Sequence, residues 1–490
     1  MGSPRRAYHH GALDRRRMLA TGDDPGDCAG GASLDPLLAP RSVAVVGASE
    51  RPGSSGCQVL CNILEGGFTG TVHAVNPRHA SVLGVPCVPS PAELPMAPDL
   101  AVVAVPQRHI PGVVRACGER GVGAVLLLSG GGGEAGTASK ELHDEVLETA
   151  DAYGMRLLGP NCAGVVNTDP AVRLDATFAV LPMQSGELGL FSQSGGIGMA
   201  LIVAAARVGL GVSQFVSGGI TADVSVNDML LHWEHDPNTR VIGVYADQLG
   251  DPSTFARIAR SVARCKPILA LHSGTADEAD LEALFRSAGV LRMATIHDLL
   301  DAARVLTGQP LPAGPRVAII GDSGGLGILA AQAAEAAGLT VAELDGATQA
   351  VLRSFVPSAP STQNPVDLGA GVAPGQVGNA LDVLLASAQI DAILTVFSES
   401  EESDTAAALR AVIGAAAASS DKPIVATQVG AEAGSVALAG ATRSLPVFMF
   451  PEAAAAALGT AYRYAQILAE PLLSLSPPAT ARVASPGDLV

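Results

Sequence analysis

The sequence is poor in aromatic residues and in cationic side chains. Phe, Trp and Tyr make up 3% of its 490 residues, and 30 Lys and Arg stand against 47 Asp and Glu, a formal net charge of −17. Nucleic acid needs a cationic surface, so this charge argues against it as the main partner. An anionic ligand therefore has to be held by local devices, such as helix N-termini and individual Arg residues.

Paired cysteines and long apolar runs are also absent. The seven Cys are scattered and include no C-x-x-C pair, so we expect no structural disulfide and no metal site, and a reduced, cytoplasmic setting. No stretch has the length and low glycine content of a membrane span. Residues 1–34 mix Arg, Gly and Asp without an apolar segment, which is typical of a disordered tail rather than a secretory signal. Residues 471–490 are expected to form a second loose tail.

Glycine is abundant, with 56 residues, and it recurs where short apolar runs end. The run Ser42–Val46 ends at Gly47 and is followed by a helical pattern from Gln58 to Leu64. Further apolar runs at 71–75, 100–105 and 124–128 end in Asn-Pro, Pro and Ser-Gly. Alternating strands and helices predict βαβ units in a parallel sheet. Ligands of such sheets bind beyond the carboxyl ends of the strands.

The chain is long enough for about three domains, and two later units begin near Leu188 and Arg316. Each of these begins with an apolar strand, a Ser-Gly-Gly sequence and an Ala-rich helix, which indicates an internal repeat at the domain level. The predicted domains are 35–158, 159–308 and 313–470.

The loop from Gly47 to Gly56 is the first candidate binding site. It reads Gly-Ala-Ser-Glu-Arg-Pro-Gly-Ser-Ser-Gly, so the backbone can approach a phosphate closely. The helix that follows offers about half a positive charge and free N–H groups. The spacing is not G-x-G-x-x-G, so the pattern does not favour NAD. A purely structural Gly-rich turn is the alternative, and the βαβ context favours anion binding over it.

Several motifs in a fixed order extend this interpretation. Ser-Val-Ala-Val-Val-Gly-Ala-Ser is followed by Val-Asn-Pro-Arg at 75–78, Leu-Gly-Pro-Asn-Cys-Ala-Gly at 158–164, Phe-Ser-Gln-Ser-Gly at 191–195 and Asn-Pro-Val-Asp at 364–367. In this order the chain resembles the NDP-forming acyl-CoA synthetases, relatives of the α subunit of succinyl-CoA synthetase, over roughly residues 34–468. The resemblance implies an α/β fold with a Rossmann-like CoA-binding domain followed by two flavodoxin-like, parallel-sheet domains.

The resemblance also implies a site for coenzyme A or acyl-CoA in the first domain. The phosphates would lie near Gly47, Ser49, Gly53 and Ser54, and the adenosine side near Asn76, Pro77 and Arg78. The pantetheine would pass Val105, Pro106, Ser129 and Gly130, and the thiol would lie near Asn161 and Cys162. A buried, inert thiol is a better interpretation of Cys162 than a nucleophile.

The second domain carries the family's phosphate-binding or oxyanion-binding helix N-terminus, at Ser192, Ser194, Gly195 and Gly196. The family's phosphohistidine loop, with its Ser-His-Thr-Gly sequence, is missing. Only ten residues separate Gly274 from the position of Phe285, and none of them is His.

Two residues are candidates for catalytic roles beside this deletion. Asp247 aligns with the Glu that supports the phosphohistidine in the family, although a solvated residue at a strand end is as good an interpretation. His272 stands where the family has Lys and could act as a general base or bind an anion, while a structural His is the simpler interpretation.

Three functions follow from this sequence. The first is an α-type acyl-CoA synthetase subunit within a homo-oligomer or hetero-oligomer, in which ATP, ADP and Mg bind only through a separate ATP-grasp subunit of β type. The second is an acyl-CoA-dependent acyltransferase whose acceptor is an amine or a thiol. The third is a non-catalytic sensor of CoA or acyl-CoA. We expect a protein that handles CoA thioesters without the phosphohistidine relay.

Overall fold

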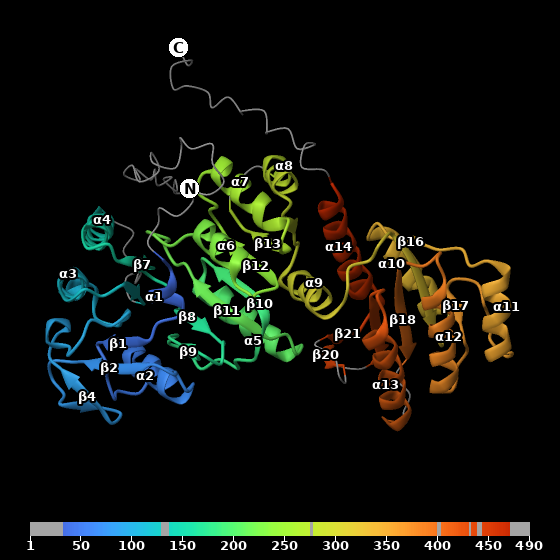
Figure 1. Ribbon diagram of the computed structural model, residues 1–490, viewed down its shortest axis with the longest axis horizontal. Helices are drawn as coiled ribbons and strands as arrows, with labels where there is room; N and C mark the ends of the chain where they lie inside the picture. Colours follow the sequence, from blue (N-terminus) through green and yellow to red (C-terminus); the bar gives the residue numbers. More distant parts are fainter. Residues whose placement is uncertain are drawn as a thin grey trace, which may run out of the picture.

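The computed structural model describes residues 33–128, 137–274, 278–398, 403–430, 433–438 and 443–470. Within these residues the strands form three seven-stranded sheets, each built largely from parallel pairs. Figure 1 shows the first and second sheets beside each other and the third at the far end, with helices α9 and α14 between the second and third. The predicted α/β class and parallel sheets are confirmed.

The first sheet has the order β3-β4-β2-β1-β5-β6-β7. Its strands are β1 Ser42–Val46, β2 Thr71–Val75, β3 Ser81–Val82, β4 Val85–Val88, β5 Leu100–Val103, β6 Ala124–Leu127 and β7 Arg156–Leu158. Its helices are α1 Asp35–Leu38, α2 Ser55–Glu65, α3 Ile110–Arg120 and α4 Thr137–Ala152, with short 3-10 turns η2 Pro91–Glu93 and η3 Gln107–His109. Every residue of β1 is buried, as expected for an apolar run in the middle of a parallel sheet.

The second sheet has the order β14-β13-β12-β10-β11-β8-β9. Its strands are β8 Val165–Asn167, β9 Leu174–Asp175, β10 Ser185–Ser192, β11 Val212–Ser217, β12 Val241–Ala246, β13 Ile268–His272 and β14 Leu291–Arg292. Its helices are α5 Gly195–Arg207, α6 Val226–His235, α7 Pro252–Ala263, α8 Glu278–Ala288 and α9 Ile296–Gly308. The parallel strands β10, β12 and β13 lie side by side, so the loops that follow them meet at one edge.

The third sheet has the order β16-β15-β18-β19-β21-β20, with β17 paired to β15. Its strands are β15 Arg316–Gly321, β16 Thr340–Val341, β17 Val366–Asp367, β18 Ala392–Ser398, β19 Ile424–Val429, β20 Gly434–Ala437 and β21 Ser444–Phe448. Its helices are α10 Gly324–Ala336, α11 Gly346–Phe355, α12 Pro374–Ala386, α13 Ser403–Ser419 and α14 Pro451–Ala469. The predicted repeat is present as strand and helix, because β15 and α10 repeat the order of β10 and α5.

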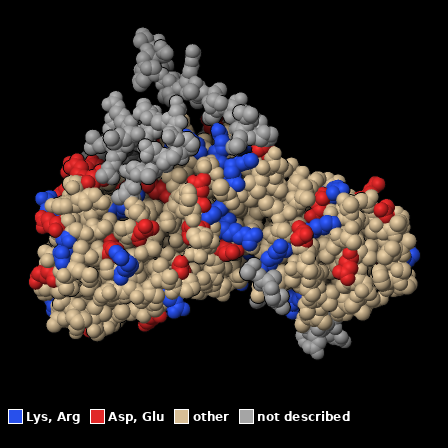
Figure 2. All heavy atoms as spheres, viewed as in Figure 1, with Lys and Arg blue, Asp and Glu red and all other residues tan. Residues whose placement is uncertain are grey.

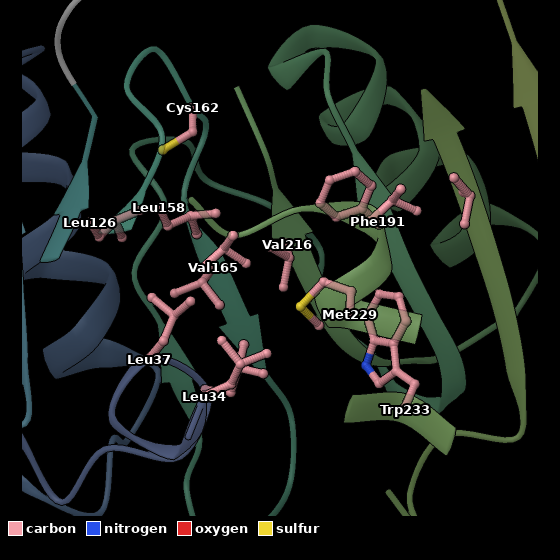
Figure 3. Close-up of a cluster of buried hydrophobic side chains, with 14 of the residues drawn as sticks. Leu34, Leu37, Leu126, Leu158, Cys162, Val165, Phe191, Val216, Met229 and Trp233 are labelled. Atoms are coloured by element: carbon pink, nitrogen blue, oxygen red, sulfur yellow. The ribbon is translucent and has the colours of Figure 1, made fainter. Parts of the chain in front are cut away.

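A single apolar cluster joins the first two sheets. Leu126 and Leu158 of the first sheet share it with Val216 and Phe191 of the second. Figure 3 shows these side chains facing one another, with Cys162 on the loop between the two sheets. Burial of shared apolar surface contributes roughly 25 cal/mol per Å², so the relative position of these sheets is fixed by their common core.

Two buried arginines fasten the three sheets to one another. Arg156 of β7 reaches Asp223 and Asp228, in and after the loop that follows β11, at 2.9 Å each. Arg304 of α9 is fully buried, donates to the carbonyl of Val447 at 2.5 Å, and lies over the ring of Phe448 with 4.5 Å to the ring centre. These contacts hold the segment after β11 against the first sheet and helix α9 against the third sheet.

Candidate functional site

Close backbone approach shapes the loop between β1 and α2. Gly47 has φ +93°, and a Cβ at this residue would lie 2.6 Å from the carbonyl oxygen of Ala104. A Cβ on Gly56 would lie 2.0 Å from the carbonyl oxygen of Gly47. Both positions therefore require glycine. The first turn of α2 packs directly against the end of β1. The helix starts at Ser55, three residues before the start predicted from the apolar pattern.

Side chains in this loop are held by short local hydrogen bonds. Ser49 Oγ accepts from the N–H of Arg51 at 3.0 Å. Ser54 is the N-cap of α2, accepting from the N–H of Cys57 at 3.4 Å and donating to the carbonyl of Arg51 at 2.8 Å. These contacts cap the start of α2, where unpaired N–H groups favour an anion.

Gly53 lies at the open tip of the loop. Its φ is +77°, and a Cβ there would have no neighbour within 4 Å. The left-handed backbone, rather than lack of room, is what requires glycine at this position. A Gly-rich loop that is open on its outer side and backed by a helix N-terminus fits the pyrophosphate of a nucleotide such as CoA.

The other predicted CoA residues follow the neighbouring strands. Asn76, after β2, donates from Nδ2 to the carbonyl of Ala48 at 2.7 Å and accepts the N–H of Arg78 at 2.8 Å, so it ties two loops together. Pro77, Arg78 and Pro106 are exposed, and Val105 is half-buried. Ser129 and Gly130 lie outside the described residues.

The turn from Gly159 to Gly164 connects the first sheet to the second. Cys162 is buried and donates from Sγ to the carbonyl of Leu127, at the end of β6, at 3.2 Å. Burial raises the pKa of this thiol to about 12, so it is protonated at neutral pH and is not a nucleophile in this state. Asn161 has φ +59°, a left-handed conformation that Asn tolerates better than most residues.

Helix α5 begins beside this turn. A Cβ on Gly195 would lie 3.2 Å from the Cβ of Ala163, the residue after Cys162. Ser194 is the N-cap, accepting from the N–H of Ile197 at 3.4 Å. Ser192 is fully buried and donates to the carbonyl of Ser194 at 2.7 Å. Gly196 has open space where a side chain would be, so the positive end of the helix can be approached there.

Asp247 and His272 lie at the ends of neighbouring strands, since Ala246 pairs with His272. Each side chain nevertheless has a hydrogen-bond partner other than the other residue. The carboxylate of Asp247 accepts from the hydroxyl of Ser273. The Nδ1 atom of His272 accepts the N–H of Gly274 at 3.1 Å, which leaves Nε2 to carry the proton of a neutral ring.

Sequence reasoning did not single out Ser273 or Tyr245. Tyr245 ends near Ser273, with its hydroxyl 2.5 Å from Ser273 Oγ. Neither residue lies in a motif that we identified. The only signal was position, because both stand near the carboxyl ends of adjacent predicted strands, where sites of parallel sheets gather.

Charged and metal-binding groups are spread through the described part of the chain. Figure 2 shows acidic and basic side chains interspersed on the visible face. Among the described residues, no His, Cys, Asp and Glu side chains gather into a set of three or more that could hold a metal ion. None of the helices in the described ranges has the length and apolarity needed to cross a bilayer.

Three family models match the chain. They are a CoA-binding domain over residues 41–168, a succinyl-CoA-ligase-like flavodoxin domain over 185–306 and a ligase-CoA domain over 317–470. The chain is 34% identical over 461 residues to the alpha subunit of ADP-forming acetate–CoA ligase I of Pyrococcus furiosus, covering 89% of this chain and 98% of that protein. The chain belongs to the ADP-forming acyl-CoA ligase family.

Other relatives agree with this membership. The chain is 32% identical to ADP-forming acetate–CoA ligase I of Archaeoglobus fulgidus, covering 78% of this chain and only 57% of that longer protein. Among solved structures, apo acetyl-coenzyme A synthetase 1 of Candidatus Korarchaeum cryptofilum superposes with a TM-score of 0.81 at 29% identity, over 89% of this chain and 98% of that one. The predicted resemblance to α-type CoA-binding and ligase domains is confirmed.

Proposed function

We propose that this chain binds CoA and acyl-CoA and handles CoA thioesters without the family's phosphohistidine relay. The phosphates of the cofactor lie against the loop of Gly47, Ser49, Gly53 and Ser54, and the adenosine side lies near residues 76–78. The pantetheine runs past Val105 and Pro106 toward Cys162. This path follows the carboxyl ends of β1, β2, β5 and β6, which is where a doubly wound sheet binds its ligand.

We infer the loss of the relay from the short connection between β13 and α8. Five residues separate His272 from Glu278, and they read Ser-Gly-Thr-Ala-Asp. His272 does not replace the missing loop, because its Nδ1 lone pair already accepts a backbone N–H. A phosphoryl carrier needs a free imidazole lone pair and a carboxylate behind it, whereas Asp247 is bonded to Ser273.

In this proposal the three domains span 35–158, 159–308 and 313–470, and the chain works in the cytoplasm. Any ATP, ADP and Mg chemistry takes place on a separate ATP-grasp subunit of β type. Support for such a subunit comes from the Pyrococcus relative, which is named an alpha subunit. A partner could supply nucleotide binding but could not supply a His to this chain.

Radiolabelled phosphate transfer tests the loss of the relay. The purified chain is incubated with γ-labelled ATP and Mg, with and without an ATP-grasp subunit. A family member that carries the Ser-His-Thr-Gly loop serves as the matched control. We expect acid-labile label on the control and none on this chain. Acid-labile phosphate that appears on this chain and is absent from the His272→Asn variant would contradict the proposal.

A further inference from the structure

Three polar side chains form a hydrogen-bonded chain at the ends of β12 and β13. The hydroxyl of Tyr245 lies 2.5 Å from Ser273 Oγ, and Ser273 Oγ donates to Oδ1 of Asp247. A carboxylate only accepts hydrogen bonds, so the single proton of Ser273 points at Asp247 and Tyr245 donates to Ser273. The serine hydroxyl is therefore polarised toward a base.

The surroundings hold this arrangement in place. Gln193 Oε1 accepts from the N–H groups of Asp247 at 2.7 Å and Gln248 at 3.0 Å, which fixes the loop after β12. A Cβ on Gly274 would lie 2.5 Å from the carbonyl oxygen of Asp247. Only glycine allows the end of β13 to come this close, and this approach places Ser273 on the carboxylate. Ser273 and Asp247 are both exposed, so a substrate can reach them.

The hydroxyl lies on a continuous path of contacts to the turn that carries Cys162. Gln193 directly precedes the N-cap of α5, and its Nε2 is 3.4 Å from Thr221 Oγ1. The neighbouring residue, Ile220, donates its N–H to the carbonyl of Pro160 at 3.0 Å. The proposed thiol end of the CoA path and the Ser273 hydroxyl are thus linked indirectly, through the loops that carry Gln193 and Thr221.

We propose that Ser273 is an acyl-accepting nucleophile, with Asp247 as its base and Tyr245 as a positioning residue. This inference rests on the proposed function, since it takes a CoA thioester as the acyl donor. Ser273 Oγ bonds to the thioester carbonyl carbon, and its proton passes to Asp247. The carbon–sulfur bond then breaks, the CoA thiolate takes up that proton, and the products are O-acylserine and free CoA thiol. No oxidant, nucleotide or further reactant is needed.

Mass spectrometry of the acylated chain tests this role. Calorimetry first identifies which of acetyl-CoA, butyryl-CoA and benzoyl-CoA bind. The chain is then mixed with each binder, quenched in acid and digested. The expected result is one acyl group on the peptide containing Ser273. Ser273→Ala abolishes it while retaining acyl-CoA binding, and Ser253→Ala, which alters an exposed serine at the start of α7, leaves it unchanged.

Two further variants separate catalysis from a structural role. Asp247→Asn keeps the shape of the side chain but removes the base, so labelling slows by about 10²- to 10⁴-fold, the range of general acid–base effects. Ser273→Cys carries the acyl group as a thioester, which neutral hydroxylamine removes, whereas the serine ester resists it. If Ser273 had only a structural role, its substitution would change the stability of the chain, and the unaltered chain would carry no acyl group.

The outcomes are distinguishable from failure of the proposed function. Binding of an acyl-CoA without any acyl group on Ser273, or labelling that survives Ser273→Ala, overturns the inference and leaves CoA binding in place. No binding by any of the three acyl-CoA probes or by CoA itself overturns the proposed function.

Discussion

Replacement of Gly53 by Ala should separate CoA binding from folding. In the free protein the exposed loop tip can relax out of the left-handed conformation, because no neighbour lies within 4 Å of the new Cβ. In the complex the loop has to return to φ +77° to fit the phosphates. An L-residue held in that region costs about 1–2 kcal/mol, which corresponds to about 5- to 30-fold weaker CoA binding.

Gly154→Ala is the matched control for this substitution. Gly154 has φ +68°, and a Cβ added there would likewise have no neighbour within 4 Å, but it lies between α4 and β7, at the opposite edge of the sheet. The turn at Gly154 cannot relax in the same way, because the N–H of Gly154 donates to the carbonyl of Asp151 at 3.1 Å and the N–H of Met155 donates to the carbonyl of Ala150 at 2.9 Å. The control should therefore lower the free energy of unfolding by about 1–2 kcal/mol without changing the Kd for CoA. Calorimetry gives the Kd and urea unfolding gives the stability. Equal CoA affinity of Gly53→Ala and the unaltered chain, or equal weakening by both variants, would refute the assigned position of the phosphates.

Three other predictions concern the junctions and the buried thiol. Arg156→Met should cost about 3–5 kcal/mol in urea unfolding, since it leaves two carboxylates near β7 without their cation; a loss below about 1 kcal/mol would contradict this. Arg304→Met should expose the linker at 309–315 to limited proteolysis, and unchanged cleavage would argue against its clamping role. Because the pKa of Cys162 is raised to about 12, its thiolate is scarce at pH 7–9. Iodoacetamide should therefore spare Cys162 in the native chain and modify exposed Cys265; peptide mapping that finds both modified would disprove the burial argument.

Local pattern was sufficient to predict the α/β class and the central parallel strands, whereas the Rossmann-like and flavodoxin-like assignment came from the family resemblance. Short apolar runs ending in Gly, Pro or Ser, separated by helical periodicity, specify parallel strands because such strands are buried on both faces. Element ends were less well predicted. The run Leu100–Val105 leaves the sheet after Val103. Helix α2 begins at Ser55 rather than at Gln58, because its start is set by the N-cap Ser54 and not by apolar spacing.

The interactions of the candidate site depend on register, which the sequence does not display. Asp247 and Ser273 are 26 positions apart, and they meet only because Ala246 pairs with His272 across two parallel strands. The partner of Arg156 was equally hidden, because Asp223 lies in a loop of the next sheet. Motif order could indicate CoA chemistry, but not which side chains are already occupied by hydrogen bonds.

Calorimetric titration of CoA into the purified chain, without nucleotide and without a second subunit, tests the central claim most directly. The proposed site predicts saturable binding of one CoA per chain, weakened by Gly53→Ala and unchanged by Ser253→Ala. Absence of binding at millimolar CoA, or binding that is insensitive to Gly53→Ala, would contradict a CoA site built on this loop.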